Sequence, residues 1–339
     1  MTRRLLDNRN LSILVILGLF VIMFGYGSFA YTGFFAVQNF LNLFIDNAYL
    51  LILAVGMTFV ILSGGIDLSV GSMLGLGTMI ASSLVTKQHL NPMLVIVIVV
   101  LVGTALGFFM GCLITLFELP PFIITLAGYY LARGLCYVVS IDTIAISDPV
   151  FQSAAHSEIH IIGNSFVSPS AIIAVVVVLV GAYVLRFTRF GRTVYAIGGN
   201  EQSALLMGLP VGRTKIGIYA LSGFCSGLAG VVFTFYTLSG YALDGKGMEL
   251  DAIAAVVIGG TLLTGGSGSI LGTVLGVLVY GTIQVLIVFQ GTLNSWWTRI
   301  AIGFLVFVFC ALQRLFETRK EATAVRGASR TSAAVAGGG

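Results

Sequence analysis

The sequence predicts an all-α polytopic membrane protein, and its composition carries this prediction. Of the 339 residues, 58% are hydrophobic and 9% are charged, whereas a typical soluble domain is ~45–50% apolar and ~25% charged. A soluble fold of this length cannot bury so much apolar surface, which excludes a cytosolic enzyme, a nucleic-acid-binding protein and a disordered scaffold. The 43 glycines agree with this fold class, because small residues let membrane helices approach closely.

About ten apolar segments are long enough to cross the bilayer, which takes ~20 residues of helix. The more polar stretch 141–169 separates the fifth segment from the sixth and is predicted to be a long loop. The predicted spans are Leu11–Tyr31, Ala48–Gly64, Leu68–Thr86, Pro92–Phe117, Pro120–Ser140, Ser170–Leu185, Ile216–Ser239, two within Ala252–Thr298, and Trp296–Leu312.

The first segment could be mistaken for a signal peptide. Arg3-Arg4 precede it, and Ser28-Phe29-Ala30 resembles a cleavage site. Its 21 uncharged residues, however, exceed the ~7–15 that are typical of the apolar region of a signal peptide. We therefore predict a retained first helix.

The apolar run Ala252–Thr298 holds 47 residues without a charge, too many for one helix. Gly265-Gly266-Ser267-Gly268 divides it near the middle into the eighth and ninth spans. Within this run, Leu263-Thr264-Gly265-Gly266 resembles Leu62-Ser63-Gly64-Gly65 at the end of the second span. Six spans separate the two turns, so both are predicted on the cytoplasmic side.

The basic residues predict the orientation, because Lys and Arg concentrate in cytoplasmic loops. With ten spans, three clusters fall on one side and hold 13 of the 17 basic residues, so both termini are predicted to be cytoplasmic. Residues 1–316 are predicted to form one membrane domain, and 317–339 a disordered tail. The three clusters are Arg3, Arg4 and Arg9; Arg186, Arg189, Arg192, Arg213 and Lys215; and Arg314, Arg319, Lys320, Arg326 and Arg330.

The longest cytoplasmic loop, about 188–214, contains a predicted short helix over Glu201–Met207. Asn200 is placed to cap it, Glu201 suits its positive end, and Gly208 is placed to end it. The helix is expected to present Ala204, Leu205 and Met207 at the membrane face. Two interpretations stay open: a surface helix lying on lipid headgroups, or a docking helix that transmits force from a soluble partner.

The spans contain few ionisable groups, and these usually face a cavity or a partner. Arg133 lies within the fifth span, too far along the helix from Glu118 for a local contact. No Asp, Glu, His or Lys relay runs through the spans, so coupling energy is expected to come from outside the bilayer. The scattered neutral polar groups suit a neutral, hydroxyl-rich solute, although helix–helix hydrogen bonding explains each one equally well.

The chain is not expected to bind a nucleotide itself. The segment Gly240–Gly247 matches the first seven positions of a phosphate-binding loop, but Gly247 stands where Ser or Thr should hold Mg²⁺. No cofactor site and no catalytic residue are predicted in this chain.

Four stretches resemble the permease subunits of bacterial ABC importers for monosaccharides, the carbohydrate uptake transporter 2 group that includes the ribose permease. The resemblance covers about residues 40–315. Three further segments are most similar to a permease of a galactofuranose importer. The four stretches are Ala54–Gly71, Pro121–Gly128, Tyr195–Glu201 and Leu250–Thr261, and the three segments are Gly240–Leu243, Gly291–Leu293 and Ser295–Thr298.

The resemblance implies a fold of the vitamin B12 permease type in the bacterial inner membrane. It implies as partners a second permease, identical or different, a tandem-domain ATPase that holds ATP and Mg²⁺, and a periplasmic sugar-binding protein. It also implies that the short cytoplasmic helix docks on the ATPase. The residues carried over for that docking are Gly198, Gly199, Asn200, Glu201, Ala204, Met207 and Gly208.

The sequence therefore predicts the membrane subunit of an ATP-driven importer that translocates galactofuranose or a related pentose or hexose by alternating access. A stand-alone channel or facilitator for small neutral solutes is the alternative. An intramembrane hydrolase would need two reacting groups at one depth, and the sequence offers none. The residues predicted to line or gate the path are Asn47, Thr58, Ser69 and Phe122.

Overall fold

The computed structural model describes residues 8–162, 165–292 and 296–311. The predicted tail 317–339 and the first basic residues therefore lie outside the described residues. The helices are α2 (Asn8–Ala30), α3 (Val37–Asp46), α4 (Ala48–Leu62), α5 (Val70–Thr86), α6 (Pro92–Leu116), α7 (Pro121–Val139), α8 (Pro149–His156), α9 (Pro169–Phe187), α10 (Arg189–Gly199), α11 (Glu201–Leu206), α12 (Val211–Thr237), α13 (Met248–Ile258), α14 (Ile270–Gln290) and the unlabelled Trp296–Ala311.

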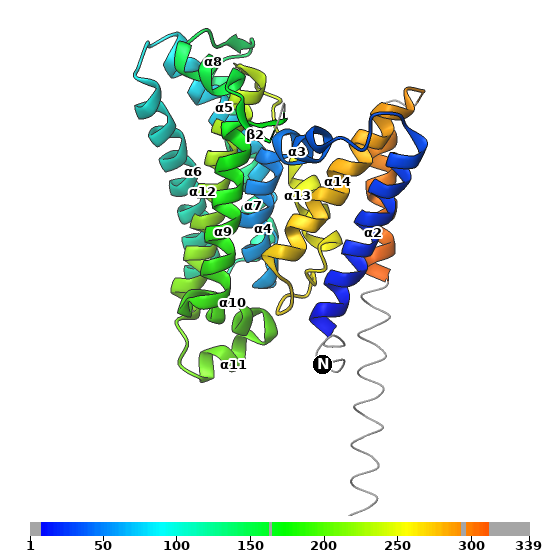
Figure 1. Cartoon of the computed structure of the whole chain (residues 1–339). Helices are drawn as coiled ribbons and strands as arrows, with labels where there is room; N and C mark the ends of the chain where they lie inside the picture. The colour runs from blue at the N-terminus through cyan, green and yellow to red at the C-terminus, as the bar shows by residue number, and fades with distance from the viewer. Residues whose placement is uncertain (1–7, 163–164, 293–295, 312–339) are drawn as a thin grey trace, which may run out of the picture.

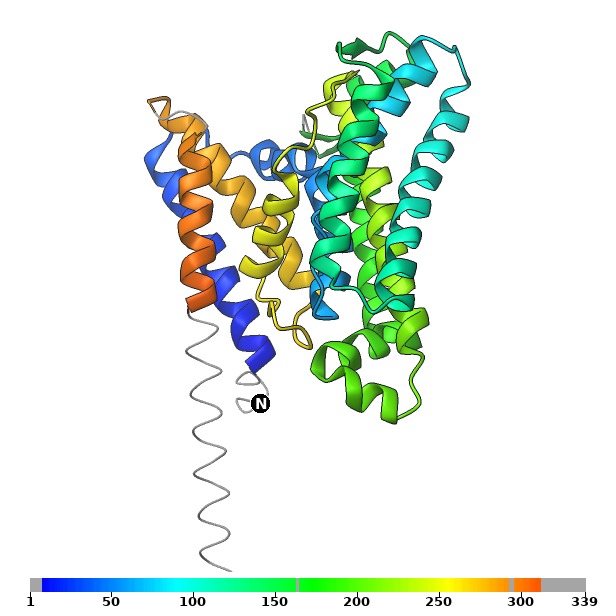
Figure 2. The same ribbon diagram turned by 180° about the vertical axis from the view of Figure 1, so that it is seen from behind.

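The long helices stand side by side, with α10 and α11 at one end of the bundle and α8 at the other (Figure 1). The start of α2 and the end of the helix Trp296–Ala311 both lie at the α10–α11 end, as Figure 2 shows from behind. Which end faces the cytoplasm stays a prediction from the basic residues.

Six described helices are long and apolar enough to cross a membrane, or seven if the pair α3 and α4, bent by 57°, counts as one span. Each predicted span contains a helix, so the polytopic helical fold is confirmed, while the count of ten stays a prediction. The eighth span is the weakest match, because α13 has 11 residues and gives way to irregular backbone over 259–269. Gly260, Gly265 and Gly266 adopt positive φ in this stretch. Glycine adopts this backbone conformation more readily than any other residue, and it does not continue a helix.

The structure differs from the sequence-based prediction in three segments. The short helix α3 precedes the second span, and α10 occupies the first half of the predicted cytoplasmic loop. The polar stretch 141–169 is not a simple loop, since it contains α8 and the strands β1 (Ile144–Ala145), β2 (Ile159–Ile162) and β3 (Ser165–Val167). β1 pairs antiparallel with β4 (Ser239–Gly240), and β2 pairs antiparallel with β3.

Helix α4 lies at the centre of the bundle. Every one of its residues except Tyr49 is buried, and its sequence is accordingly apolar on all faces, as expected of a helix surrounded by protein. It contacts α9, α12, α13 and α14. The core therefore forms around α4, and the more exposed helices α6, α7 and α9 lie outside it.

Helices α6 and α12 pack closely together, with glycines facing each other. A Cβ on Gly103 would lie 2.5 Å from the carbonyl oxygen of Gly223, and a Cβ on Gly223 would lie 2.2 Å from that of Gly103. Gly107 and Gly227 extend the seam by one turn on each helix. Only residues without side chains permit this approach, which is the packing mode expected between membrane helices.

Candidate functional site: the coupling segment and the buried polar groups

The last residues of α10 pack directly against the two similar glycine turns. The Gly266 amide donates to the Leu62 carbonyl oxygen at 2.9 Å, which joins the turn after α13 to the turn after α4. A Cβ on Gly198 would lie 1.8 Å from that same Leu62 oxygen and 2.4 Å from the Gly266 nitrogen. The Tyr195 hydroxyl donates to the Gly268 carbonyl oxygen at 2.8 Å. The sequence shows that the turns are alike, and the structure shows that they meet against α10.

The predicted short helix is present as α11. The Asn200 side chain accepts a hydrogen bond from the Ser203 amide at 2.7 Å, as a helix N-cap does. The helix ends at Leu206, one residue before the predicted end, and Gly208 follows at φ +75°. Its amide donates to the Leu205 carbonyl oxygen at 2.9 Å. The predicted start and stop signals are therefore confirmed.

Ala204 does not belong to the exposed face on which it was predicted. It is fully buried and packs with Ile197 of α10 and Val211 of α12, because the turn of α11 directs this position toward the bundle. Leu205 and Met207 are exposed as predicted, and Leu206 is 89% exposed. Ala204 thus anchors α11, and the apolar tip 205–207 faces away from the protein.

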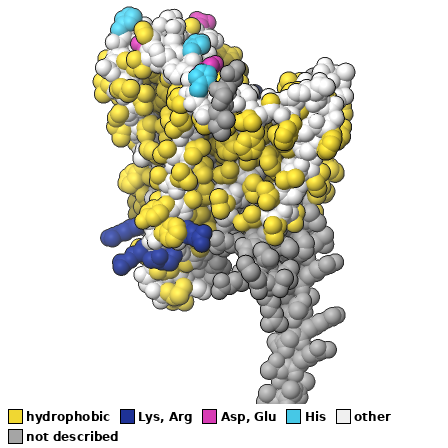
Figure 3. Space-filling view, in the orientation of Figure 1, with side chains coloured by type: hydrophobic (Ala, Val, Ile, Leu, Met, Phe, Trp, Pro, Cys, Tyr) yellow, Lys and Arg dark blue, Asp and Glu magenta, His cyan; other side chains and the backbone are white. Residues whose placement is uncertain are grey.

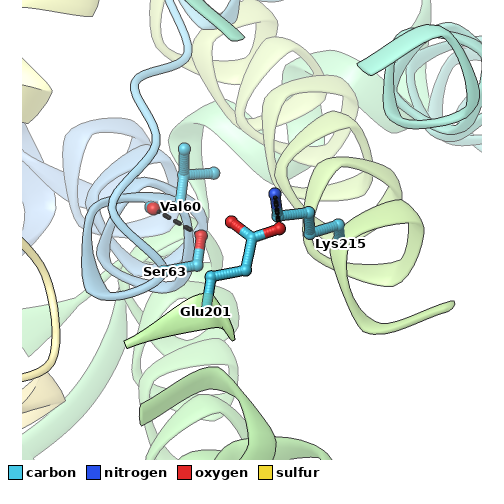
Figure 4. A network of polar contacts seen from close by, with 4 residues as sticks. All are labelled: Val60, Ser63, Glu201 and Lys215. Atoms are coloured by element: carbon cyan, nitrogen blue, oxygen red, sulfur yellow. Dashed lines mark hydrogen bonds and ion pairs between the residues drawn. The ribbon is translucent and has the colours of Figure 1, made fainter. Parts of the chain in front are cut away.

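Glu201 forms an ion pair with Lys215 of α12 at 2.6 Å, the one salt bridge among the residues that the structure describes. Figure 4 shows the Glu201 side chain directed at Lys215, with Ser63 at the end of α4 in the same view. The Ser63 hydroxyl donates to the Val60 carbonyl oxygen at 2.8 Å. Because both charged side chains are partly exposed, this pair contributes ~0.2–1 kcal/mol.

Three of the four predicted pathway residues are buried and hydrogen-bonded within the chain. Asn47 sits at the bend between α3 and α4 and donates to the Leu43 carbonyl oxygen at 3.0 Å. The Thr58 hydroxyl lies 2.7 Å from that of Thr273, which connects α4 to α14. Phe122 is different, since it is 53% exposed on α7. That these four residues line or gate one path stays a prediction.

Ser69, the fourth of these residues, belongs to a buried carboxylate site that sequence reasoning missed. Asp67 is completely buried, and its Oδ1 accepts hydrogen bonds from the Ser69 amide at 2.9 Å and the Ser69 hydroxyl at 2.6 Å. Its Oδ2 accepts from the Ser222 hydroxyl of α12 at 2.7 Å. The Asp-Leu-Ser spacing is a local signal for the first two contacts, but nothing in the sequence pairs Asp67 with Ser222.

Arg133 binds the loop between α12 and α13. Its Nη1 donates to the carbonyl oxygens of Ala242 at 2.5 Å and Asp244 at 2.8 Å. The Asp244 carboxylate accepts from the Tyr241 amide and from the Thr78 hydroxyl of α5. Burial raises the pKa of the Asp244 carboxyl above its usual range, and these hydrogen bonds act in the opposite direction. The loop is therefore held to both α7 and α5.

Comparison with known proteins shows the family of the chain. Residues 39–310 match the family described as "Branched-chain amino acid transport system / permease component". The inner membrane ABC transporter permease protein YjfF of Escherichia coli is 47% identical over 94% of this chain and 97% of that protein.

Two further relatives are named for the import of a sugar. The fructose import permease protein FruG of Bifidobacterium longum is 41% identical over 91% of this chain and 92% of that protein. The ribose import permease protein RbsC of Haemophilus influenzae is 37% identical over 94% and 96%. No solved structure gives a significant match. The chain therefore belongs to this ABC permease family and is a multi-pass protein of the bacterial inner membrane.

Proposed function

We propose that this chain is the membrane subunit of an ATP-driven importer that translocates a monosaccharide into the cytoplasm by alternating access. The observation that carries the proposal is the contact of α10 with both glycine turns, through Gly198, Leu62 and Gly266. A push on the exposed tip of α11 is thereby applied to the end of α4 and to the turn that follows α13. The sugar-import names of the relatives support the same function.

The partners in this proposal are a tandem-domain ATPase that binds ATP and Mg²⁺, a periplasmic sugar-binding protein and a second permease. The exposed Leu205, Leu206 and Met207 form an apolar tip of the kind that docks in a groove of a soluble protein. The ATPase is proposed to supply the energy through this tip. The differential contacts of α11 in the two states of the ATPase would then shift the permease between its conformations.

A neutral sugar suits the buried polar groups of the described residues. Asp67 is occupied by serine donors, and Arg133 donates to loop carbonyl oxygens. Both oxygens of the Asp67 carboxylate are engaged within the chain, whereas Nε and Nη2 of Arg133 are buried without a hydrogen-bond partner among the described residues. Galactofuranose is the proposed substrate, or a related pentose or hexose, because of the segments Gly240–Leu243, Gly291–Leu293 and Ser295–Thr298.

Reconstitution tests this function. We expect sugar uptake into liposomes only when the second permease, the ATPase with ATP and the binding protein are all supplied. The variant Leu206→Glu should abolish ATP-driven uptake while the chain stays inserted in the membrane. Gln202→Glu, which adds the same charge on the exposed side of α11, is the matched control. Sugar flux through the chain alone would favour the channel alternative and refute the importer.

A further inference from the structure

Two adjacent hollows on the α9–α12 side of the molecule have opposite chemistry. The first has a volume of about 690 Å³. Three arginines from α10 and α12 contribute to its wall, and no carboxylate does. Its lining residues are Arg189, Phe190, Arg192, Thr193, Leu209, Pro210, Arg213 and Thr214. We call this the basic hollow.

The positive charge of the basic hollow is not neutralised inside the described part of the chain. Arg189, Arg192 and Arg213 are exposed, and none of them forms an ion pair with a described carboxylate. The first turns of two helices, α10 and α12, also line the hollow, and no side chain caps the first residues of α12. Helix N-termini carry partial positive charge that adds to the field of the guanidinium groups. The hollow is therefore built for an anion.

The second hollow is an apolar groove of about 390 Å³ between α9 and α12, with α4 behind it. Its wall has no polar surface. Such a groove fits a hydrocarbon chain and excludes a sugar or an ion. Its lining residues are Val55, Phe59, Ile172, Ile173, Val176, Val177, Val180, Gly181, Val184, Leu221, Phe224, Cys225 and Leu228.

The two hollows follow one another along the same helices. Phe59 of the groove and Phe190 of the basic hollow pack against each other, with ring centroids 6.1 Å apart. On α12, Arg213 and Leu221 are eight residues apart, a rise of about 12 Å. That separation suits a headgroup and the first part of its acyl chain.

The height of the basic hollow distinguishes a lipid from a protein as its occupant. Figure 3 shows Lys and Arg side chains gathered at the level of α10, directly below the hydrophobic surface of the spans and above the lower tip of the molecule. The exposed residues of α11 occupy that lower tip. A soluble partner would meet the tip first, whereas lipid headgroups lie where the hydrophobic surface ends.

We propose that the two hollows form one site for an anionic phospholipid, with the phosphate-bearing headgroup among Arg189, Arg192 and Arg213 and one acyl chain in the groove. The site joins α9, α10 and α12 at the base of the coupling segment. An anionic lipid bound there would stabilise the arrangement of α10 from which α11 projects. This site is independent of the transported solute.

Native mass spectrometry of the full chain in a neutral detergent tests the site with dioleoyl phosphatidylglycerol, dioleoyl phosphatidylcholine and inorganic phosphate as probes. We expect preferential binding of phosphatidylglycerol. Each basic residue near an anionic lipid contributes about a factor of five, so Arg213→Gln should weaken binding about fivefold and the double variant Arg189→Gln/Arg213→Gln about 30-fold. Arg186→Gln removes the same charge one turn away, outside both hollows, and should bind normally.

The groove has its own matched pair of variants. Val180→Trp should fill the groove and weaken phosphatidylglycerol binding at least tenfold, whereas Leu179→Trp, on the neighbouring exposed position outside the groove, should not. Arg213→Lys should restore most of the binding, which keeps the test valid if the glutamine variant folds poorly. Three results would overturn the proposal. The first is equal binding of the two lipids, and the second is an equal effect of Arg213→Gln and Arg186→Gln. The third is phosphate binding that Val180→Trp does not change, together with phosphatidylglycerol binding no tighter than that of phosphate. Loss of ATPase association with normal lipid binding would assign the arginines to the ATPase instead.

Discussion

The amide of Gly266 donates a hydrogen bond to the carbonyl oxygen of Leu62 at 2.9 Å. The two residues are 204 positions apart in the chain, and each belongs to a glycine turn that follows a buried helix, α4 or α13. Gly198 crosses above this bond so closely that it leaves no room for a side chain. The contact therefore places three distant segments in one junction.

Gly198→Ala is expected to disrupt this junction. Its Cβ would overlap the Leu62 carbonyl oxygen, so α10 must move or the Leu62–Gly266 bond must break, at a cost of about 1–3 kcal/mol. The thermal unfolding temperature in detergent and the rate of ATP-driven uptake should both fall. Gly199→Ala is the matched control, since nothing lies within 4 Å of its Cβ position. Equal behaviour of the two variants would show that the junction does not transmit coupling.

Glu201→Gln is expected to change stability by no more than about 1 kcal/mol, because its ion pair with Lys215 is partly exposed. Lys215→Gln removes the same pair from the other side. If Glu201 acts through Lys215 alone, the two variants should reduce uptake equally in matched liposomes. A larger loss for Glu201→Gln would place the carboxylate in contact with the ATPase.

Asp67→Ala is expected to destabilise the fold by about 2–4 kcal/mol, because it leaves buried serine hydroxyls and an amide without their acceptor. Ser222→Ala should cost less, about 1 kcal/mol. A double-mutant cycle of the two substitutions, measured by unfolding in detergent, should give a coupling energy of about 0.5–3 kcal/mol. Additive effects would mean that the Asp67–Ser222 contact does not stabilise the protein.

Arg133→Leu is expected to release the loop 241–247 from α7, because the carbonyl oxygens of Ala242 and Asp244 lose their donor. Hydrogen exchange of the loop amides should accelerate at least tenfold. Lys246→Leu removes a positive charge from the exposed part of the same loop and should leave exchange at Tyr241 and Asp244 near its normal rate. Unchanged exchange in Arg133→Leu would refute the proposed restraint.

Ala204→Leu is expected to displace α11 from its seat, since Ala204 is fully buried against Ile197 and Val211. Overpacking of this kind costs about 1–3 kcal/mol. Ser203→Leu, at the neighbouring exposed position, should be tolerated. Limited proteolysis of the segment 200–210 would separate the two, because only a displaced α11 becomes accessible to cleavage.

Hydropathy and helix-capping chemistry account for most of what the sequence predicts correctly. The positions of the long helices follow from apolar runs, and the bounds of α11 follow from Asn200 and Gly208. Helix α3 was missed because it has only ten residues and mixes polar with apolar side chains, unlike a membrane span. The shortness of α13 was missed because hydropathy does not distinguish apolar helix from apolar irregular backbone.

The site was less predictable than the fold, for a physical reason. Capping is a contact between residues three apart, which a sequence displays directly. The partners of Asp67, Thr58 and Arg133 lie more than 100 positions away in the chain. Their chemical types suggest that they have partners, but only the packing of helices determines which ones. The inward orientation of Ala204 likewise depends on Val211, beyond the end of α11.

The burial of α4 limits how this protein can change shape. A helix enclosed on all sides cannot tilt sideways without displacing its neighbours, because protein interiors are close-packed and leave little free volume. It can still slide or rotate about its own axis. A displacement applied at Leu62 is therefore delivered to the bend at Asn47, about 22 Å away along the helix, which makes that bend the natural exit point for motion that begins at the α10–α11 end.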